Sequence, residues 1–321
     1  MNKYPTYSVS IRTLGTAGKK YQETLNSVAR QTVKPEKVLV YIPHGYALPK
    51  ETIGVEEYVR CDKGMVTQRS QPFDEITSEY ILFLDDDLSF EANFVQKLFD
   101  GLLSMDGDCI SPDIYRVQNE STLIKIRNFL GGTTPHYDNK WAFKIKKNAH
   151  YSYNNHSARG VLLSQSAAGA CILCKKSAYH AIRFQEERWI DQISFSFGED
   201  LLFSYKLYKH GYKVLISYDA QIIHLDAGSG HEKNKAKMAY ASAFCRYLIW
   251  HRIIYSVQES HIDRAICLFY LYVQKFMSLL LSIVIIIVNH NLNTVIASID
   301  GENKAKKYIK SSNYKQLPRF F

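Results

Sequence analysis

The stretch Tyr80-Ile81-Leu82-Phe83-Leu84-Asp85-Asp86-Asp87 decides the fold prediction, because an apolar run passes directly into three carboxylates. A continuous apolar run predicts a strand that is buried on both faces, as in a parallel sheet. Neighbouring carboxylates at the end of such a strand need a counter-charge, since they repel one another and lose solvation. Their hard oxygen ligands suit Mg²⁺ or Mn²⁺ better than Zn²⁺. The stretch therefore predicts a divalent metal at the carboxyl end of a strand, where ligands of open α/β sheets collect. The alternative is a solvated acidic turn.

Strands and helices alternate on both sides of this stretch. The pattern predicts strands at 7–12, 37–42, 58–59 and 108–111, and helices at about 19–30 and 91–104. After an irregular segment from about 113 to 165, it predicts strands at 167–174, 213–216 and 221–224 and a helix that opens at Glu199-Asp200. This alternation is typical of a doubly wound sheet. We therefore predict an α/β fold with a Rossmann-like, mostly parallel sheet and flanking helices.

Composition narrows the setting of the protein. The 321-residue chain has a net charge of +9, which indicates nucleic acid, an anionic membrane surface or phosphorylated ligands as partners. Its six cysteines form no disulfide framework, and the first residues do not read as a signal peptide, so we expect a reduced, cytosolic protein. Cys171-x-x-Cys174 lies in an apolar run, and we interpret it as two buried core thiols instead of a zinc or redox site.

The C-terminal part of the chain has a different character. Residues 265–288 are almost wholly apolar, which as a helix is long enough for a hydrocarbon core of ~30 Å. The exceptions are Gln274 and Lys275, and a lysine near the centre of a span costs about 2.5–3.5 kcal/mol. A helix that lies in the interface avoids this cost. Basic residues follow, as anionic headgroups require, from Lys304 to Arg319. We predict a membrane-associated helical segment and no nucleic-acid partner; the alternative is a buried helix.

Further polar residues occupy comparable places in the predicted elements. Glu199 and Asp200 open a helix, where the helix dipole favours carboxylates with or without a catalytic role. His224 ends a short strand and is either a ligand or a structural histidine. Asp62, Lys63 and Arg69 flank the turn after the third strand, at the same edge of the sheet as the carboxylates.

The order of these motifs resembles that of the family 2 glycosyltransferases, which have the GT-A fold. The resemblance covers roughly residues 6–226. It rests on five segments that match the family's motifs in order and spacing: Leu25–Thr32, Lys63–Ser70, Tyr80–Asp87, Phe197–Leu202 with His210–Val214, and Ala220–His224.

The resemblance implies a role for each matching residue. Residues 85–87 correspond to the D-x-D motif, in which Asp87 binds the metal and Asp85 binds the ribose or the metal. Asp200 is then the general base that deprotonates the acceptor hydroxyl, Glu199 orients the acceptor, and His224 completes the metal or diphosphate site. The remaining residues expected at the nucleotide donor are Arg12, Asp62, Lys63, Arg69 and Asp86. A single base with in-line attack implies inversion at the anomeric carbon.

The chain departs from the family at the motif with which the family commonly recognises the nucleotide base of the donor. After the second strand it has Tyr41-Ile42-Pro43-His44-Gly45 in place of Asp-Asp-Gly-Ser, so base recognition falls elsewhere, with Asp62 as a candidate. The candidate sugar-stacking aromatics, for which the alternative is a core role, are Trp141, Tyr151, Tyr153 and Trp189.

We therefore predict a catalytic domain at 1–230 and a helical, membrane-associating region at 231–321. The predicted enzyme is a Mn²⁺- or Mg²⁺-dependent inverting glycosyltransferase of the polysaccharide-biosynthesis type, at the cytoplasmic face of the cell membrane. Its donor is a UDP-, GDP- or dTDP-linked sugar, and its acceptor a growing glycan or polyprenyl-linked sugar. The alternatives are a non-catalytic membrane-bound scaffold and a nucleotidyltransferase. For the latter, the glycine-containing loop at 15–20 lacks P-loop spacing.

Overall fold

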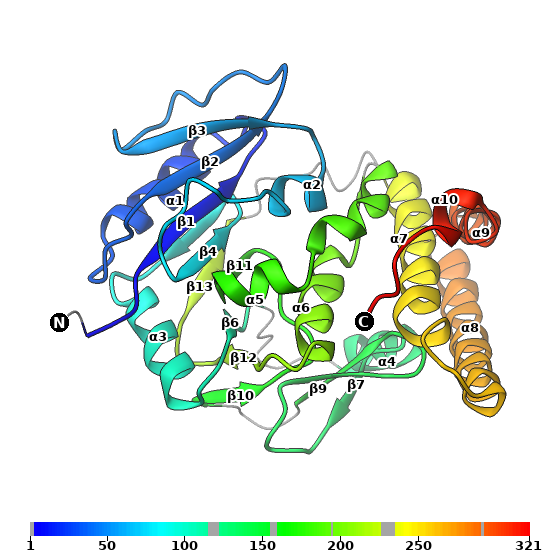
Figure 1. Ribbon diagram of the computed structural model, residues 1–321. Helices are drawn as coiled ribbons and strands as arrows, with labels where there is room; N and C mark the ends of the chain where they lie inside the picture. Colours follow the sequence, from blue (N-terminus) through cyan, green and yellow to red (C-terminus); the bar gives the residue numbers. More distant parts are fainter. Residues whose placement is uncertain (1–2, 115–121, 155–158, 194, 226–234, 290–291) are drawn as a thin grey trace. The chain divides into compact units, whose positions relative to one another are not determined.

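The structure is a computed structural model that describes residues 3–114, 122–154, 159–193, 195–225, 235–289 and 292–321 (Figure 1). The chain forms two compact units. Unit 1 comprises Met1–Arg116, Ser157–Asp191 and Glu199–Ser229, and unit 2 comprises Val117–His156, Gln192–Gly198 and Gly230–Phe321. Two segments of the predicted catalytic domain therefore group with the C-terminal residues.

Unit 1 is built on one large sheet. In the described part of the chain its strand order is β10-β12-β6-β11-β4-β1-β2-β3. The pairs β3–β2, β2–β1, β1–β4 and β6–β12 are parallel, whereas β11 runs antiparallel to both of its neighbours and β10 antiparallel to β12. The strands are β1 (Tyr7–Arg12), β2 (Val38–Pro43), β3 (Glu56–Cys61), β4 (Tyr80–Leu84), β6 (Cys109–Pro112), β10 (Val161–Leu163), β11 (Cys171–Lys175) and β12 (Val214–Ser217). The predicted α/β fold with a mostly parallel sheet is confirmed.

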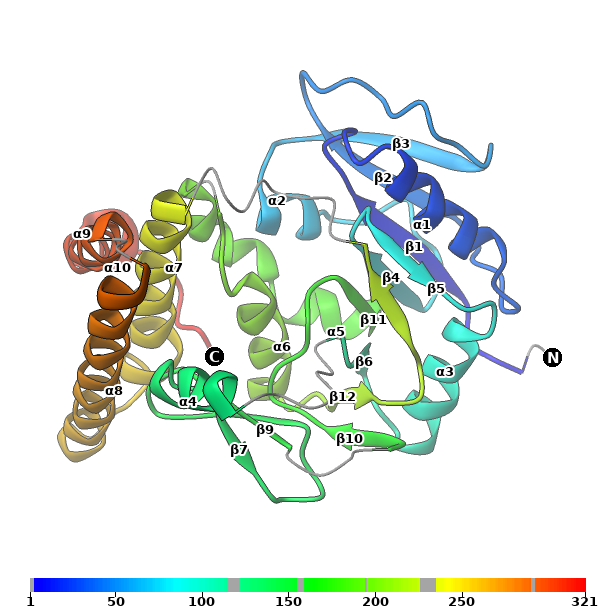
Figure 2. The same cartoon turned by 180° about the vertical axis from the view of Figure 1, so that it is seen from behind.

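Helices cover both faces of this sheet. Helices α1 (Lys19–Ala29) and α3 (Phe94–Ser104) lie on one face, and α5 (Lys176–Ala181) and α6 (Glu199–Lys209) lie on the other (Figures 1 and 2). Alternate strand residues point to each face, as the two-residue period of a strand requires. Leu82 and Leu84 of β4 belong to the core under α1 and α3, whereas Phe83 contacts Tyr179 and Phe203. The short helix α2 (Met65–Arg69) and the 3₁₀ segment η1 (Phe184–Gln192) complete the described helices of this unit.

A small antiparallel ladder extends the acidic strand. Strand β5 (Leu88–Phe90) pairs with β13 (Ile222–His224), and the register sets His224 opposite Leu88. The backbone N–H of Leu225 donates to the Asp87 carbonyl at 2.7 Å, which continues the ladder by one residue. Thr24 of α1 also holds the start of β5, because its hydroxyl donates to the Leu88 carbonyl oxygen and accepts from the Leu88 N–H. The strand pairing therefore brings the end of β13 beside the third carboxylate.

Unit 2 is mainly helical. The described helices are α4 (Thr122–Leu130), α7 (Lys235–Trp250), the π-helical η2 (His251–Tyr255), α8 (His261–Asn289), α9 (Leu292–Tyr308) and α10 (Ser312–Lys315). Its described strands are β7 (Thr134–His136), β8 (Phe143–Ile145) and β9 (Tyr151–Asn154). These strands and α4 fall in the segment that the sequence analysis leaves irregular, because strands of three or four residues are too short to show a period. Helices α7 and α9 pack closely, since a Cβ on Gly301 would lie 2.2 Å from the Tyr240 carbonyl oxygen.

The cysteines support the reading of a reduced protein core. All six lie within the described residues, and each is free and buried. Cys171 and Cys174 both belong to β11, in the middle of the large sheet, and burial raises the pKa of each thiol. Thiols of this kind are inert structural residues.

Candidate active site

Parallel strands bring the predicted site residues to one edge of the sheet. β3, β2, β1 and β4 are neighbours in this order, so the residues that follow them share the carboxyl edge. Arg12 ends β1, Asp62 and Lys63 follow β3, and Asp85 follows β4. Asp62 and Lys63 are exposed, and the Lys63 ammonium donates to the Tyr46 hydroxyl at 2.5 Å. Arg12 and Asp85, in contrast, enter a buried network.

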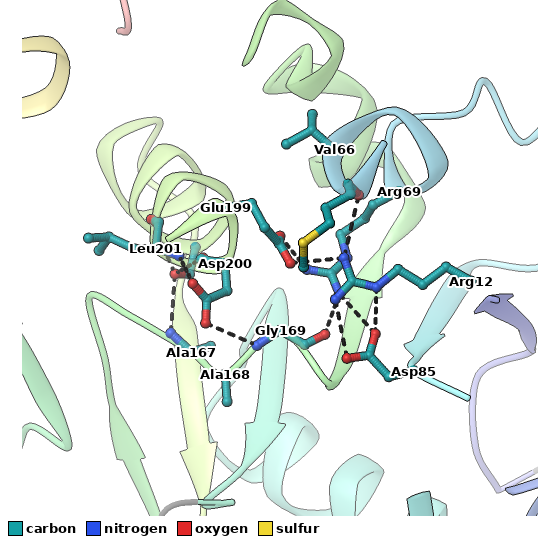
Figure 3. A network of polar contacts seen from close by, with 12 residues as sticks. Arg12, Val66, Arg69, Asp85, Ala167, Ala168, Gly169, Glu199, Asp200 and Leu201 are labelled. Atoms are coloured by element: carbon teal, nitrogen blue, oxygen red, sulfur yellow. Dashed lines mark hydrogen bonds and ion pairs between the residues drawn. The ribbon is translucent and has the colours of Figure 1, made fainter. Parts of the chain in front are cut away.

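Two arginines and two carboxylates form the centre of this network. Arg12 binds both oxygens of Asp85, with Nε 2.5 Å from Oδ1 and Nη2 3.2 Å from Oδ2. Glu199 bridges the arginines, because its Oε1 lies 2.9 Å from Arg12 Nη1 and its Oε2 lies 2.6 Å from Arg69 Nη1. Arg69 Nη2 also lies 3.7 Å from Asp85 Oδ1. Figure 3 shows the two arginines between the two carboxylates, which join β1, α2, β4 and α6. The four charges balance, as burial requires.

The charges of this network hold Asp85 ionised. Burial acts to raise the pKa of Asp85, but the Arg12 charge and hydrogen bonds outweigh it, so the pKa is lowered. Arg69 has a side chain that is only 1% exposed, and burial together with the Arg12 charge lowers its pKa. The Arg69 guanidinium is therefore enclosed by Asp85, Glu199 and the Gly169 carbonyl group. Its contact with the nucleotide donor remains a prediction.

Gly169 connects the arginine network to Asp200. Arg69 Nη2 donates to the Gly169 carbonyl oxygen, and the Gly169 N–H lies 3.4 Å from Asp200 Oδ2. A Cβ at this position would lie 2.8 Å from Arg69 Nη1 and 2.9 Å from the Asp200 Cβ, so the packing requires glycine. Figure 3 shows Gly169 between Asp200 and the arginines. The two groups of carboxylates are therefore parts of one structure.

Asp200 has the protonation behaviour of a general base. It lies in the first turn of α6 and is half-buried. Burial, and then the neighbouring Glu199 charge, raise its pKa to about 6, although the Leu201 N–H at 2.8 Å and the Arg69 charge act in the opposite direction. A catalytic base works best when its pKa lies near the working pH. At neutral pH Asp200 is ionised and still able to take a proton.

The other two carboxylates of the acidic stretch point to different partners. Asp86 Oδ2 accepts from the Thr13 hydroxyl at 2.5 Å, and burial raises the pKa of Asp86 to about 6. Asp87 Oδ1 lies 3.3 Å from His224 Nε2. The sequence placed Asp87 and His224 in one site, and their contact depends on the pairing of β5 with β13. The sequence placed Asp85 in the same site, whereas in the structure Asp85 is bound by the arginines and lies apart from this pair.

The Asp87–His224 pair fits a divalent cation that takes its other ligands from a substrate and water. Two adjacent ligands of an octahedral ion at ~2.1 Å are ~3 Å apart, close to the observed 3.3 Å. Among the described residues no group of three or more His, Cys, Asp or Glu side chains gathers as a metal cage. Mg²⁺-type sites in proteins commonly use one or two side chains together with substrate phosphates and water. The pair therefore fits an ion that arrives with a diphosphate.

Three residues that support the site were missed by the sequence analysis. They are Thr13, Gly169 and Asp191. Asp191 anchors α2, because its Oδ1 and Oδ2 accept from the Val66 N–H at 3.1 Å and the Thr67 N–H at 2.8 Å. The small residues before β11 are a signal for the close approach at Gly169, whereas nothing in the sequence singles out Asp191.

The candidate stacking aromatics have separate surroundings. Trp189 is buried, and its indole N–H donates to Glu187 Oε2 at 2.7 Å. The same Glu187 binds Lys206 of α6, whose ammonium lies 2.9 Å from its Oε1, so this buried ion pair links η1 to α6. The other three aromatics, Trp141, Tyr151 and Tyr153, lie in unit 2. Their contact with sugar remains a prediction.

Comparison with known proteins finds one family model that matches part of the chain. The model of the family described as glycosyl transferase family 2 matches residues 55–176, which include the acidic strand and Arg69. No curated protein matches the chain.

Two solved structures are similar in fold. The mannosyltransferase PcManGT from Pyrobaculum calidifontis, in complex with GDP-Man and Mn²⁺, has a TM-score of 0.52 and 10% identity and covers 98% of this chain and 83% of its own. GalNAc-T7 with UDP, GalNAc and Mn²⁺ has a TM-score of 0.50 and 14% identity over 78% of this chain. This chain spans 51% of the GalNAc-T7 chain, about half its length.

The two solved structures show that this chain has the GT-A fold. Within that fold, residues 55–176 are similar to glycosyl transferase family 2.

Proposed function

We propose that this chain is a metal-dependent inverting glycosyltransferase that moves a sugar from a nucleotide-linked donor to a growing or polyprenyl-linked glycan. One observation carries the proposal. The Asp87–His224 pair and Asp200, whose pKa is about 6, both lie in unit 1, where Gly169 and the two arginines tie Asp200 to the end of the acidic strand. A cation-binding pair and a base in one unit are what glycosyl transfer needs.

The donor half of the site is assigned to the acidic stretch. Asp87 and His224 would hold Mn²⁺ or Mg²⁺, and this ion would neutralise the charge that develops on the departing diphosphate. Arg12 and Asp86 stand at the same edge as this pair, and Asp62 and Lys63 lie further along it, after β3. The neighbours' ligands, UDP in one and GDP-Man in the other, support a UDP-, GDP- or dTDP-linked donor.

The acceptor half of the site is assigned to α6. Asp200 takes the proton of the acceptor hydroxyl, and base catalysis of this kind contributes about 10²–10⁴-fold. Asp200 Oδ2 is the better candidate for this proton, because its contact with the Gly169 N–H is long at 3.4 Å. Both oxygens of Glu199 are taken by arginines, so Glu199 acts through Arg12 and Arg69 as a positioning residue.

The setting that we propose is cell-surface polysaccharide assembly at the cytoplasmic face of the membrane. Nucleotide sugars and reduced cysteines both suit the cytosol. The apolar helix α8 and the exposed basic residues that follow it support an acceptor presented at a membrane. Residues 1–230 would then carry the transfer chemistry, and residues 231–321 the association with the membrane.

A screen of nucleotide sugars tests the proposal. Each donor is added to the full chain with Mn²⁺, and thermal stability and donor hydrolysis are measured. A bound donor raises the melting temperature by mass action. We expect one nucleotide class to do so, and EDTA to reverse it. Asp87→Asn should weaken donor binding, whereas Asp200→Asn should retain binding and lose hydrolysis.

Two other outcomes would replace the proposal. No response to any nucleotide sugar with metal present would favour a non-catalytic scaffold. Stabilisation by free nucleoside triphosphates with release of pyrophosphate would favour a nucleotidyltransferase.

A further inference from the structure

Helix α8 turns its apolar residues outward. In the part of α8 whose side chains the structure describes, Phe269, Tyr272 and Phe276 are each more than 60% exposed. Further exposed apolar residues follow the same side at helical spacing: Ile262, Val273, Leu279, Leu280 and Ile283. The amphipathic helix of a soluble protein has the opposite arrangement, with its apolar stripe toward the core.

The two polar residues that interrupt the apolar run of α8 have partners within unit 2. Gln274 is buried, where its amide donates to the Leu130 carbonyl oxygen at 2.9 Å and accepts from Asn148 at 3.3 Å. Lys275 Nζ lies 2.6 Å from Glu302 Oε1 of α9. These two residues interrupt the apolar run of the sequence, and both are satisfied within unit 2. They leave the outward side of α8 without a charge at its middle.

Other helices of unit 2 also carry exposed apolar residues. Leu292, Ile296 and Ile299 are exposed on α9 at spacings of four and three residues. Helix α4 packs against α8 (Figure 2). On α4, Ile126 and Phe129 are exposed. We call these residues, together with the outward side of α8, the apolar face. Basic side chains are exposed on the same two helices: Lys125, Arg127, Lys304 and Lys307.

We propose that the apolar face binds an anionic lipid bilayer, with α8 lying in the plane of the interface and not crossing it. Residues His261–Ile283 are long and apolar enough to cross a membrane, with a mean hydropathy of 1.7. A crossing helix, however, must meet hydrocarbon on its free sides along its whole length. α8 instead has a covered side with the buried amide of Gln274 and with Lys275, which pairs with Glu302 of α9.

The composition of the apolar face matches an interface. Aromatic residues, including tyrosines, favour the boundary between headgroups and acyl chains. Lysine and arginine at the edge of an apolar surface favour anionic headgroups. A helix with one apolar side and basic neighbours is the pattern of an in-plane membrane anchor. This inference rests on the membrane association proposed above and specifies its surface, its lipid and its geometry, and it does not depend on sugar transfer.

Vesicle flotation tests the lipid partner. The full chain, without donor, is mixed with vesicles of phosphatidylcholine alone or with phosphatidylglycerol added. We expect binding to both and stronger binding to the anionic vesicles. The double variant Phe269→Asp with Phe276→Asp should lower the partition coefficient by about tenfold or more. Val55→Asp is the matched control, because Val55 of unit 1 is 62% exposed, and it should bind like the parent.

Two results of this experiment would overturn the proposal. One is equal binding of the double variant and its parent. The other is absence of vesicle binding combined with self-association in solution that the double variant abolishes, which would assign the apolar face to a second copy of the chain. We expect the variants to melt at the temperature of the parent, since the altered side chains are exposed. Equal melting temperatures would exclude unfolding as the cause of lost binding.

Depth measurements separate the in-plane arrangement from a crossing one. An environment-sensitive fluorophore is attached after Ile262→Cys, Tyr272→Cys or Ile283→Cys, and the native cysteines remain because they are buried. Quenchers placed at two depths in the lipid then report the position of each label. A helix in the plane gives three similar, shallow depths. A crossing helix gives a deep label at the middle position, and that result would refute the proposal.

Discussion

Replacing Asp200 by asparagine should slow transfer by orders of magnitude and yet stabilise the protein. The pKa of Asp200 is raised from its usual 3.8 to about 6, mainly by burial. A carboxyl group whose pKa is raised in the folded state destabilises that state when the group is ionised. The cost is fully present above the pKa of the folded state and is absent below the pKa of the unfolded state. The window of the effect is therefore about pH 4 to 6, with the full cost present at pH 8.

The size of the effect follows from the shift. About two pKa units correspond to ~3 kcal/mol. Asp200 is half-buried and keeps contact with solvent, which reduces this figure. The asparagine can also retain the bond from the Leu201 N–H but turns its amide toward the Gly169 N–H. We expect a gain of about 1–2 kcal/mol at pH 8, or ~2–6 °C in melting temperature.

Melting temperatures of parent and variant at pH 8 and pH 4 provide the assay. The difference between the two proteins should be present at pH 8 and vanish at pH 4, while turnover at pH 8 falls about 10²–10⁴-fold. In the parent, turnover should fall as the pH drops through about 6, the pKa of Asp200. Asp74→Asn, at an exposed carboxylate of the same unit, is the control and should change neither property. A variant destabilised at pH 8 would refute the reasoning.

Three further predictions concern the network and the metal pair. Arg69→Ala should lower the free energy of unfolding, measured in urea, by about 3–5 kcal/mol, because it leaves buried carboxylates without a counter-charge. Arg30→Ala, at an ion pair whose arginine is 53% exposed, should lower it by under ~1 kcal/mol, and equal losses would count against a buried network. Gly169→Ala should lower kcat about tenfold or more in a chain that still folds, since its Cβ would come within 2.8 Å of Arg69 Nη1, and normal turnover would rule this out. Asp87→Asn and His224→Ala should each raise the Mn²⁺ concentration needed for donor-dependent thermal stabilisation by about tenfold or more, and an unchanged requirement would exclude the pair as the cation site.

Local patterns in the sequence were sufficient for the main elements of unit 1. The strand predicted at 7–12 is β1, and the apolar run before Asp85 is β4. Helix α6 begins at Glu199 as the motif indicates. These predictions succeed because a strand buried on both faces is written as a continuous apolar run, as in β4, and a helix buries about every 3.6th residue, so the order of residues alone records both. The antiparallel insertion of β11 between β4 and β6 has no such local signal.

The sequence by itself determined which groups could do chemistry: a row of carboxylates after a strand, an acidic pair at a helix start, a histidine at a strand end, and an apolar helix long enough for a membrane. Only the tertiary structure decided how they are used. It engages Asp85 with Arg12 and leaves Asp87 to His224, and it gives Gln274 and Lys275 of α8 partners within unit 2. The reason is physical: a contact between residues on different strands or helices depends on strand pairing and packing, and no local period encodes it.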